Sequence, residues 1–159
     1  MGYILPCMVD YEYKTKPYQH QHDVLMLSWD KKNWAYFMEM GTGKSKVCID
    51  NATMLRERGE IDTFIVVAPK GVYRNWANLE IPAHMPDRVR KASQALLAVD
   101  ESTAIKSPKA SRTKALLKMS ELAKYKRILT GFPVTQSPMD LWAQCRFLDK
   151  TLLGDCGDN

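Results

Sequence analysis

The sequence predicts a three-layer α/β protein, in which a mainly parallel sheet has helices on both faces. The first observation is that short apolar runs alternate with longer segments of helical periodicity about four times, as in strands joined by helical crossovers. The second is that glycine, proline or acidic residues directly follow several of these runs. The third is the length of 159 residues, with 45% hydrophobic and 26% charged residues, which suits one globular domain.

The first half of the chain contains two predicted strands and a helix between them. The run NWAYF at 33–37 ends at a glycine loop and is the first strand candidate. Residues 44–58 follow with helical spacing, and Gly59 stands where a helix commonly ends. The run TFIVVA at 63–68 is β-branched and almost wholly apolar, as expected for a strand covered on both faces, and Pro69 stops it. The expected apolar face of the helix comprises Val47, Ile49, Ala52, Met54 and Leu55.

The second half continues the alternation. A short helix is expected at 73–79, a buried strand (ALLAV) at 95–99, and a short strand at 127–129. Residues 108–124 have helical periodicity, and Ser-Pro-Met-Asp at 137–140 indicates the start of a last helix, with a capping serine and proline in its first turn. The expected apolar positions of the 108–124 helix are Ala115, Leu116, Met119, Leu122 and Ala123.

Composition excludes several classes of protein. The net charge of +5 permits a polyanionic partner without requiring one. The four cysteines and three histidines lack the spacing of a metal site, so we expect reduced thiols, with Cys48 in the core, and structural or exposed histidines. No apolar run is long enough to span a bilayer, and the N-terminus resembles neither a secretory signal nor a myristoylation site. The sequence therefore indicates a soluble intracellular protein, cytoplasmic unless its place is a nucleus or an infected host cell.

The stretch MEMGTGKS at 38–45 lies between the first strand and the first long helix. A glycine loop in this position directs backbone N–H groups at an anion. We expect Gly41, Thr42 and Gly43 to surround phosphates, Lys44 to reach the β- and γ-phosphates, and Ser45 to hold Mg²⁺ through its hydroxyl. The alternative is a plain turn with a surface lysine.

Asp100 and Glu101 end the apolar strand LLAV. Two carboxylates beside a core are costly unless a cation or a proton meets them. We expect Asp100 to hold Mg²⁺ through water and Glu101 to position and deprotonate an attacking water. The alternative is a solvated turn.

Two further segments have weaker signals. Thr130 and Gly131, in RILTGFPVTQSP, would place a hydroxyl where it senses a nucleotide, or they form a plain strand–turn–helix joint. Gln19, in the segment KPYQHQ that precedes the first expected helix, would hydrogen-bond an adenine edge, or it is a surface glutamine. Ligands of open α/β sheets lie outside the carboxyl ends of the strands, so these segments are expected on one rim of one sheet.

Five segments, in this order, resemble the first RecA-like lobe of Swi/Snf-type translocases in helicase superfamily two. They are KPYQHQ, EMGTGKS, FIVVAPKGVYRNWANLE, VDESTAIKSPKASRTKAL and LTGFPVTQSPMDLWAQCRFL. The similarity extends from about residue 16 to about 153, which gives a lead-in at 1–15, the lobe at 16–153 and a tail at 154–159.

The resemblance implies a three-layer RecA-like P-loop fold, ATP and Mg²⁺ as cofactors, and an ATPase that moves on duplex DNA without sequence preference. It implies that Gln19 reads adenine and that Thr130 and Gly131 couple ATP to DNA. The nucleic-acid contacts expected near the nucleotide rim are Pro69, Lys70, Arg74 and Lys106.

Two departures from the family pattern bear on these roles. Thr103 stands where the family commonly has histidine after its Asp-Glu pair. Between Glu80 and Leu96 lie only 15 residues, fewer than in the family, so the lobe looks shortened between about 81 and 95. The second lobe, which supplies an arginine finger, is expected in cis or in trans, and without it hydrolysis is expected to be slow.

Two alternatives stay open at this stage. A non-catalytic nucleotide- or DNA-binding module is favoured by the absence of a second lobe and disfavoured by the intact Lys44, Asp100 and Glu101 set. A small-molecule kinase would suit the length, but it needs an acceptor site and an arginine-bearing lid, and it gives the TGFP segment no role.

Overall fold

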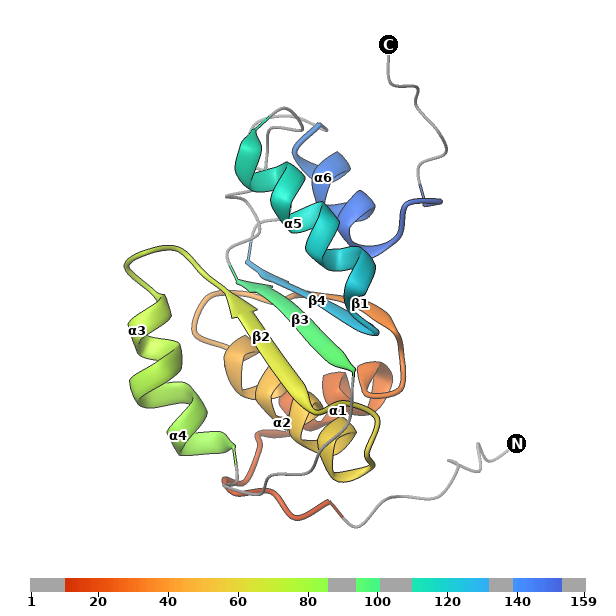
Figure 1. The fold of residues 1–159 in the computed structure, drawn as a ribbon. Helices are drawn as coiled ribbons and strands as arrows, with labels where there is room; N and C mark the ends of the chain where they lie inside the picture. The colour runs from red at the N-terminus through yellow and green to blue at the C-terminus, as the bar shows by residue number, and fades with distance from the viewer. Residues whose placement is uncertain (1–10, 86–93, 101–109, 132–138, 153–159) are drawn as a thin grey trace, which may run out of the picture.

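The computed structural model describes residues 11–85, 94–100, 110–131 and 139–152. Its four strands form one sheet in the order β1-β4-β3-β2, and every neighbouring pair is parallel (Figure 1). The strands are β1 (Asn33–Phe37), β2 (Thr63–Val67), β3 (Ala95–Asp100) and β4 (Tyr125–Thr130). The α/β class and the parallel sheet predicted from the sequence are confirmed.

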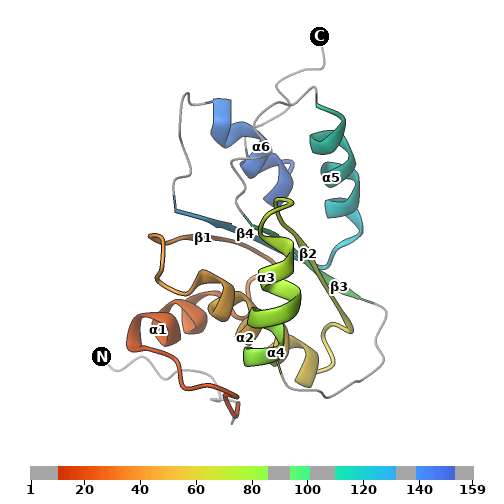
Figure 2. The same ribbon diagram turned by 90° about the vertical axis from the view of Figure 1, so that its left-hand side faces the viewer.

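Helices cover both faces of this sheet (Figures 1 and 2). One face packs against the layer that contains α1 (Gln19–Ser28), α2 (Lys44–Glu57) and a rod formed by α3 (Tyr73–Asn75), η1 (Trp76–Glu80) and α4 (Ile81–His84). The other face packs against α5 (Ser111–Leu122) and α6 (Met139–Leu148). Successive strand side chains alternate between these layers, as a pleated strand requires. Leu96 and Ala98 thus belong to the first core cluster, and Leu97 and Val99 to the second.

The pairing register brings the carboxyl ends of the strands to one rim. Phe37, the last residue of β1, pairs with Thr130, the last residue of β4. Asp100, the last residue of β3, pairs with Leu129 of β4. Strand β4 therefore lies between the glycine loop after β1 and the carboxylate that ends β3.

Three expectations about individual elements need correction. The segment KPYQHQ does not wholly precede the first helix, because α1 already begins at Gln19. Strand β2 is not covered fully on both faces: it lies at the sheet edge, and its side chains are at most half-buried. On α5, Leu116 is buried, but Met119 and Leu122 are 41% and 86% exposed, because only the face of α5 that meets the sheet and α6 is covered.

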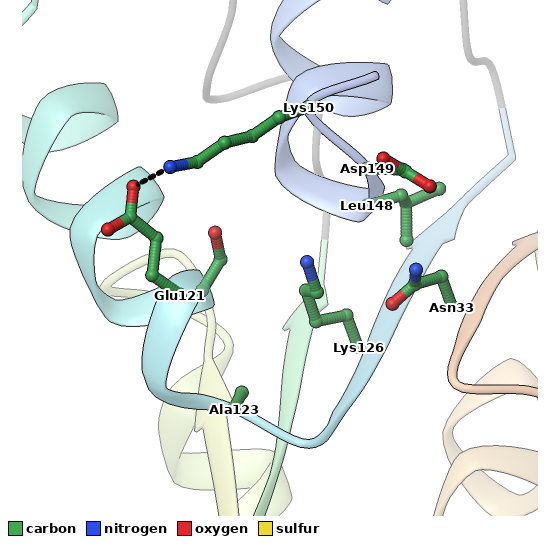
Figure 3. Close-up of a pocket in the computed structure, with 8 residues that line it drawn as sticks. Asn33, Glu121, Ala123, Lys126, Leu148, Asp149 and Lys150 are labelled. Atoms are coloured by element: carbon green, nitrogen blue, oxygen red, sulfur yellow. Dashed lines mark ion pairs between the residues drawn. The ribbon is translucent and has the colours of Figure 1, made fainter. Parts of the chain in front are cut away.

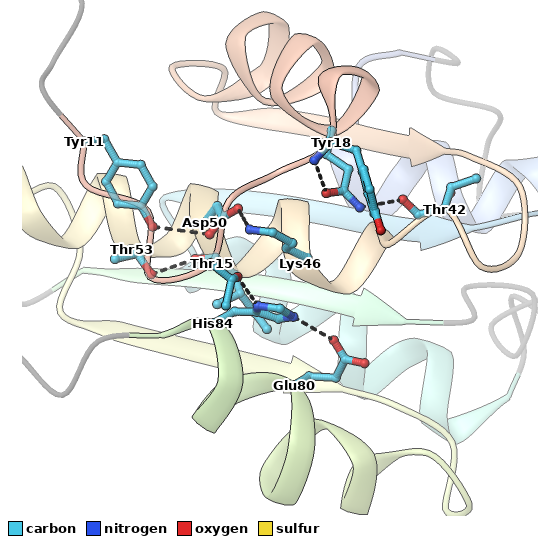
Figure 4. Close-up of polar contacts among 11 residues, drawn as sticks. Tyr11, Thr15, Tyr18, Thr42, Lys46, Asp50, Thr53, Glu80 and His84 are labelled. Atoms are coloured by element: carbon cyan, nitrogen blue, oxygen red, sulfur yellow. Dashed lines mark hydrogen bonds and ion pairs between the residues drawn. The ribbon is translucent and has the colours of Figure 1, made fainter.

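Helix α2 is buried almost all round rather than on one stripe. Besides Val47, Ile49, Ala52, Met54 and Leu55, its polar residues Lys46, Asp50, Asn51 and Thr53 are buried. Lys46 Nζ donates to Asp50 Oδ2 at 2.6 Å, and the Tyr11 hydroxyl donates to Asp50 Oδ1 at 3.3 Å (Figure 4). Burial raises the pKa of the Asp50 carboxyl, and the Lys46 partner opposes this rise. The Tyr11 bond therefore joins the start of the described chain to the helix that follows the glycine loop.

No helix within the described ranges has both the length and the apolar character needed to cross a membrane.

Candidate functional site

The glycine loop joins β1 to α2 with two residues in the left-handed region. Gly41 has φ of 77° and Gly43 has φ of 81°, where other residues are strained. Gly43 is also the N-cap of α2, and a Cβ there would overlap Nε2 of Gln21. Helix α2 begins at Lys44, so its first N–H groups lie directly after the loop and can receive an anion.

Lys44 and Thr42 close this loop onto itself. Lys44 Nζ donates to the carbonyl oxygens of Met38 at 3.0 Å and Glu39 at 2.8 Å. The Thr42 hydroxyl donates to the same Glu39 carbonyl at 2.7 Å. The ammonium that the sequence assigns to phosphate therefore lies within the loop, and a phosphate would replace carbonyl oxygens as its acceptor. Ser45 follows in the first turn of α2 and is half-buried.

Two residues of α1 contact the glycine loop, and neither of them is Gln19, the residue that the sequence singled out. Gln21 is 5% exposed, accepts from the Tyr18 backbone N–H at 3.0 Å, and donates from Nε2 to the Thr42 carbonyl at 3.0 Å (Figure 4). His20 Nε2 lies 3.0 Å from the same carbonyl. Gln19 is exposed, and its amide donates to Asp23 at 2.8 Å. The adenine contact assigned to Gln19 stays a prediction.

Sequence reasoning missed Gln21 because its role depends on a distant loop. One local signal was available: a glutamine three residues into a helix commonly bonds the backbone at the N-cap, and Gln21 does so with Tyr18. That bond leaves the Gln21 amide group directed at the Thr42 carbonyl.

The ends of β3 and β4 complete the rim. Thr130 is buried, and its carbonyl accepts from the Met38 N–H at 3.3 Å, so β4 meets the loop directly. A Cβ on Gly131 would make ordinary contacts with Met38 and Met40. Asp100 Oδ2 accepts from the indole Nε1 of Trp76 at 2.7 Å. Glu101 lies outside the described residues.

A second carboxyl group stands near Asp100. Burial raises the pKa of Glu80, and the charge of Asp100 raises it further. Glu80 Oε2 lies 3.8 Å from His84 Nε2, and His84 Nδ1 lies 2.6 Å from the Thr15 hydroxyl (Figure 4). Burial lowers the pKa of His84, with the charges of Lys46 and Lys14 adding to the effect, so the neutral imidazole is favoured.

The expected nucleic-acid residues lie just beyond the end of β2. Pro69 is half-buried, and its carbonyl accepts from the N–H groups of Val72 and Tyr73 as α3 begins. Lys70 and Arg74 are exposed, and the Arg74 guanidinium lies 5.9 Å from the Tyr73 ring centroid. Lys106 lies outside the described residues.

The residues at the rim fit a nucleotide with Mg²⁺. The loop supplies N–H groups and one cation, Ser45 supplies a hydroxyl, and Asp100 supplies a carboxylate from the same edge of the sheet. Within the described residues, no cluster of three or more His, Cys, Asp or Glu side chains could bind a metal ion by itself. A cation at this rim would thus take further oxygen ligands from phosphate and water.

A separate pocket of about 380 Å³ lies at the amino ends of the strands, opposite the rim that holds the glycine loop (Figure 3). Its lining includes Asn33 and Lys126, at the beginnings of β1 and β4, and the ion pair between Glu121 and Lys150. Burial lowers the pKa of the Lys126 ammonium. Because the pocket adjoins the amino ends of the strands, it is not part of the rim site.

Comparison with known proteins gives a structural match. No protein-family model matches the chain, and no curated protein matches its sequence. Among solved structures it is similar to the Sulfolobus solfataricus SWI2/SNF2 ATPase core in complex with dsDNA, with a TM-score of 0.78 and 21% identity. The match covers 92% of this chain and 38% of that one, so the chain spans well under half the length of the solved protein. The chain therefore has a RecA-like α/β fold that is similar to part of that ATPase core.

Proposed function

We propose that this chain is the first RecA-like lobe of a Swi/Snf-type ATPase and that it binds ATP with Mg²⁺ at the rim of its sheet. The observation that supports this most is the loop between β1 and α2. Gly41 and Gly43 adopt left-handed conformations there, Lys44 lies within the loop, and Asp100 ends a strand on the same rim.

Each residue of the site has a proposed role. The N–H groups of residues 41–45 and the Lys44 ammonium bind the β- and γ-phosphates, and Gln19 contacts adenine. Ser45 and Asp100 hold Mg²⁺, which would neutralise charge on the phosphate oxygens. Glu101 positions a water and takes its proton, and Thr130 and Gly131 couple the site to DNA.

The proposed partners are duplex DNA and a second RecA-like lobe, in cis or in trans. The similar protein was solved with dsDNA, and Lys70 and Arg74 are exposed here beyond β2. An arginine supplied from another protein or domain raises phosphoryl-transfer rates by about 10³–10⁵. We therefore propose that this chain binds nucleotide by itself and that rapid hydrolysis requires the second lobe.

The test is a thermal melt of the full chain with and without ATP and Mg²⁺. A ligand that binds only the folded state adds about 2.7 kcal/mol at a hundredfold excess over Kd. For a chain of this size that corresponds to a rise of roughly 5–10 °C in Tm. Lys44→Ala is expected to abolish the rise, whereas Lys114→Ala, an exposed site on α5, should keep it.

Only the nucleotide-induced shift decides the question, not the starting Tm. Lys44→Ala also removes the bonds to Met38 and Glu39, so this variant should melt earlier without any ligand. A folded, unaltered protein whose Tm does not respond to millimolar ATP and Mg²⁺ would refute the proposal, as would an equal shift in Lys44→Ala.

A further inference from the structure

Trp76 makes a direct polar contact with the carboxylate that ends β3. Its side chain is 3% exposed, and its indole Nε1 donates to Asp100 Oδ2 at 2.7 Å. Hydrogen bonds to a carboxylate are short and roughly twice as strong as bonds between neutral groups. The ring also packs against Phe64 of β2 in an edge-on arrangement, with centroids 6.4 Å apart. Packing against Phe64 therefore fixes the indole ring, and the ring N–H points at Asp100.

A local irregularity of the helix rod coincides with this contact. Trp76 begins the π-helical turn η1, in which the Ile81 N–H donates to the Trp76 carbonyl five residues earlier. Single π turns are rare and are frequently found at functional sites. The rod lies along the β2 side of the sheet (Figure 2), and Glu80, the last residue of the same turn, is close enough for the Asp100 charge to affect it.

We propose that Trp76 is a positioning residue that fixes the Asp100 carboxylate so that it can hold a divalent cation at the rim. The terminal torsion of an aspartate is broad, so a carboxylate at a strand end needs partners to define its plane. Carboxylates that ligate metals are commonly hydrogen-bonded by a second residue, and loss of that residue costs about 10- to 100-fold in metal affinity. The role rests on the proposed function, since Asp100 is the cation ligand there.

The perturbation should remove the donor and keep the shape. In the full chain, Trp76 is replaced with 3-benzothienylalanine, an isostere of tryptophan with sulfur in place of the N–H. The same replacement at Trp29, whose ring lies 4.2 Å from the Arg58 guanidinium, is the matched control. Thermal melts establish that both variants fold.

The first measurement is ATP affinity in excess Mg²⁺ and in EDTA. The isostere at Trp76 should weaken binding in Mg²⁺ by about tenfold and leave binding in EDTA unchanged. A merely structural indole would instead lower both affinities together. The isostere at Trp29 should change neither.

The second measurement needs no nucleotide and uses Mn²⁺ alone as a paramagnetic probe. The chain has four tryptophans, whose indole N–H signals are resolved by ¹⁵N labelling. Mn²⁺ should broaden the Trp76 signal before the other three, and Asp100→Asn should abolish that preference.

The outcomes separate this inference from the proposed function. If ATP binding depends on Mg²⁺ but the isostere at Trp76 has no effect, or an equal effect in EDTA, the inference is overturned and the proposed function stands. If ATP does not bind but Mn²⁺ broadens the Trp76 signal first in an Asp100-dependent way, the proposed function fails, while the part of the inference that places a divalent cation at Asp100 beside the Trp76 indole stands. If ATP does not bind and Mn²⁺ does not broaden the Trp76 signal first, the proposed function and the inference about Trp76 are both refuted.

Discussion

Arg127 has a fully buried side chain that makes five hydrogen bonds, and its replacement with methionine gives a quantitative test of how the fold is stabilised. Its side chain is fully buried in β4, and every guanidinium donor has an acceptor. The five bonds run to Asn51 Oδ1 at 2.9 Å and to the carbonyls of Ser28 at 3.2 Å, Lys31 at 2.8 Å, Lys32 at 3.1 Å and Lys126 at 2.8 Å.

The magnitude follows from those five bonds. The bonds to Asn51 and to the Ser28 carbonyl are buried. An unpaired Asn51 Oδ1 would cost about 1–3 kcal/mol, whereas the Ser28 carbonyl keeps the Lys31 N–H at 3.2 Å and loses only one of its bonds. The other three are partly exposed, so water can replace much of what is lost. Removing a buried charge also regains some desolvation free energy. We expect Arg127→Met to lower the free energy of unfolding by about 3–5 kcal/mol, a large share of the 5–15 kcal/mol typical of a domain.

The assay is equilibrium urea unfolding followed by circular dichroism, with two comparison variants. Arg127→Lys keeps the charge but has donors on one nitrogen only, so it should lose nearly as much as the methionine variant. Arg58→Met, at an exposed arginine whose guanidinium lies over the Trp29 ring, should lose at most about 1 kcal/mol. A loss below about 1 kcal/mol for Arg127→Met, or a nearly neutral Arg127→Lys, would refute the view that this bond network holds β4 to the end of α1.

Three further predictions concern the loop, a thiol and the proposed DNA surface. Gly43→Ala should destabilise the chain by about 1–2 kcal/mol more than Gly41→Ala in urea unfolding, since only the former displaces Gln21; equal losses would contradict this. Burial raises the pKa of Cys48 to about 12, so peptide mass spectrometry should find Cys48 unmodified after iodoacetamide treatment of the folded protein at mildly alkaline pH and modified after unfolding; labelling of the folded state would contradict this. Lys70→Ala should lower the salt slope of duplex-DNA binding by about one in fluorescence anisotropy without changing sequence preference, and an unchanged slope would exclude Lys70 from that role.

The sequence by itself predicted most of the elements and the residue types that stand at the rim. Short apolar runs bounded by glycine, proline or acidic residues predicted the four strands, because such runs are a local property of the chain. The two glycines before Lys44 predicted the loop, because a left-handed backbone favours glycine wherever the chain later folds. The helix rod after β2 was only partly predicted, since periodicity does not reveal a π turn such as Trp76–Glu80.

Only the tertiary structure decided which of these residues meet. The order β1-β4-β3-β2 places the end of β4 between the loop and Asp100, and no local pattern encodes the order of parallel strands. Asp100 bonds a tryptophan 24 residues earlier, and Arg127 bonds Asn51 across 76 residues. Leu122 is exposed although it is apolar, and Lys46 is buried although it is charged. Burial depends on which elements pack against a helix face, and the polarity of a residue alone does not reveal this. Long-range contacts form where the sheet and its two helical layers bring distant segments together, and their partners become visible only in the assembled fold.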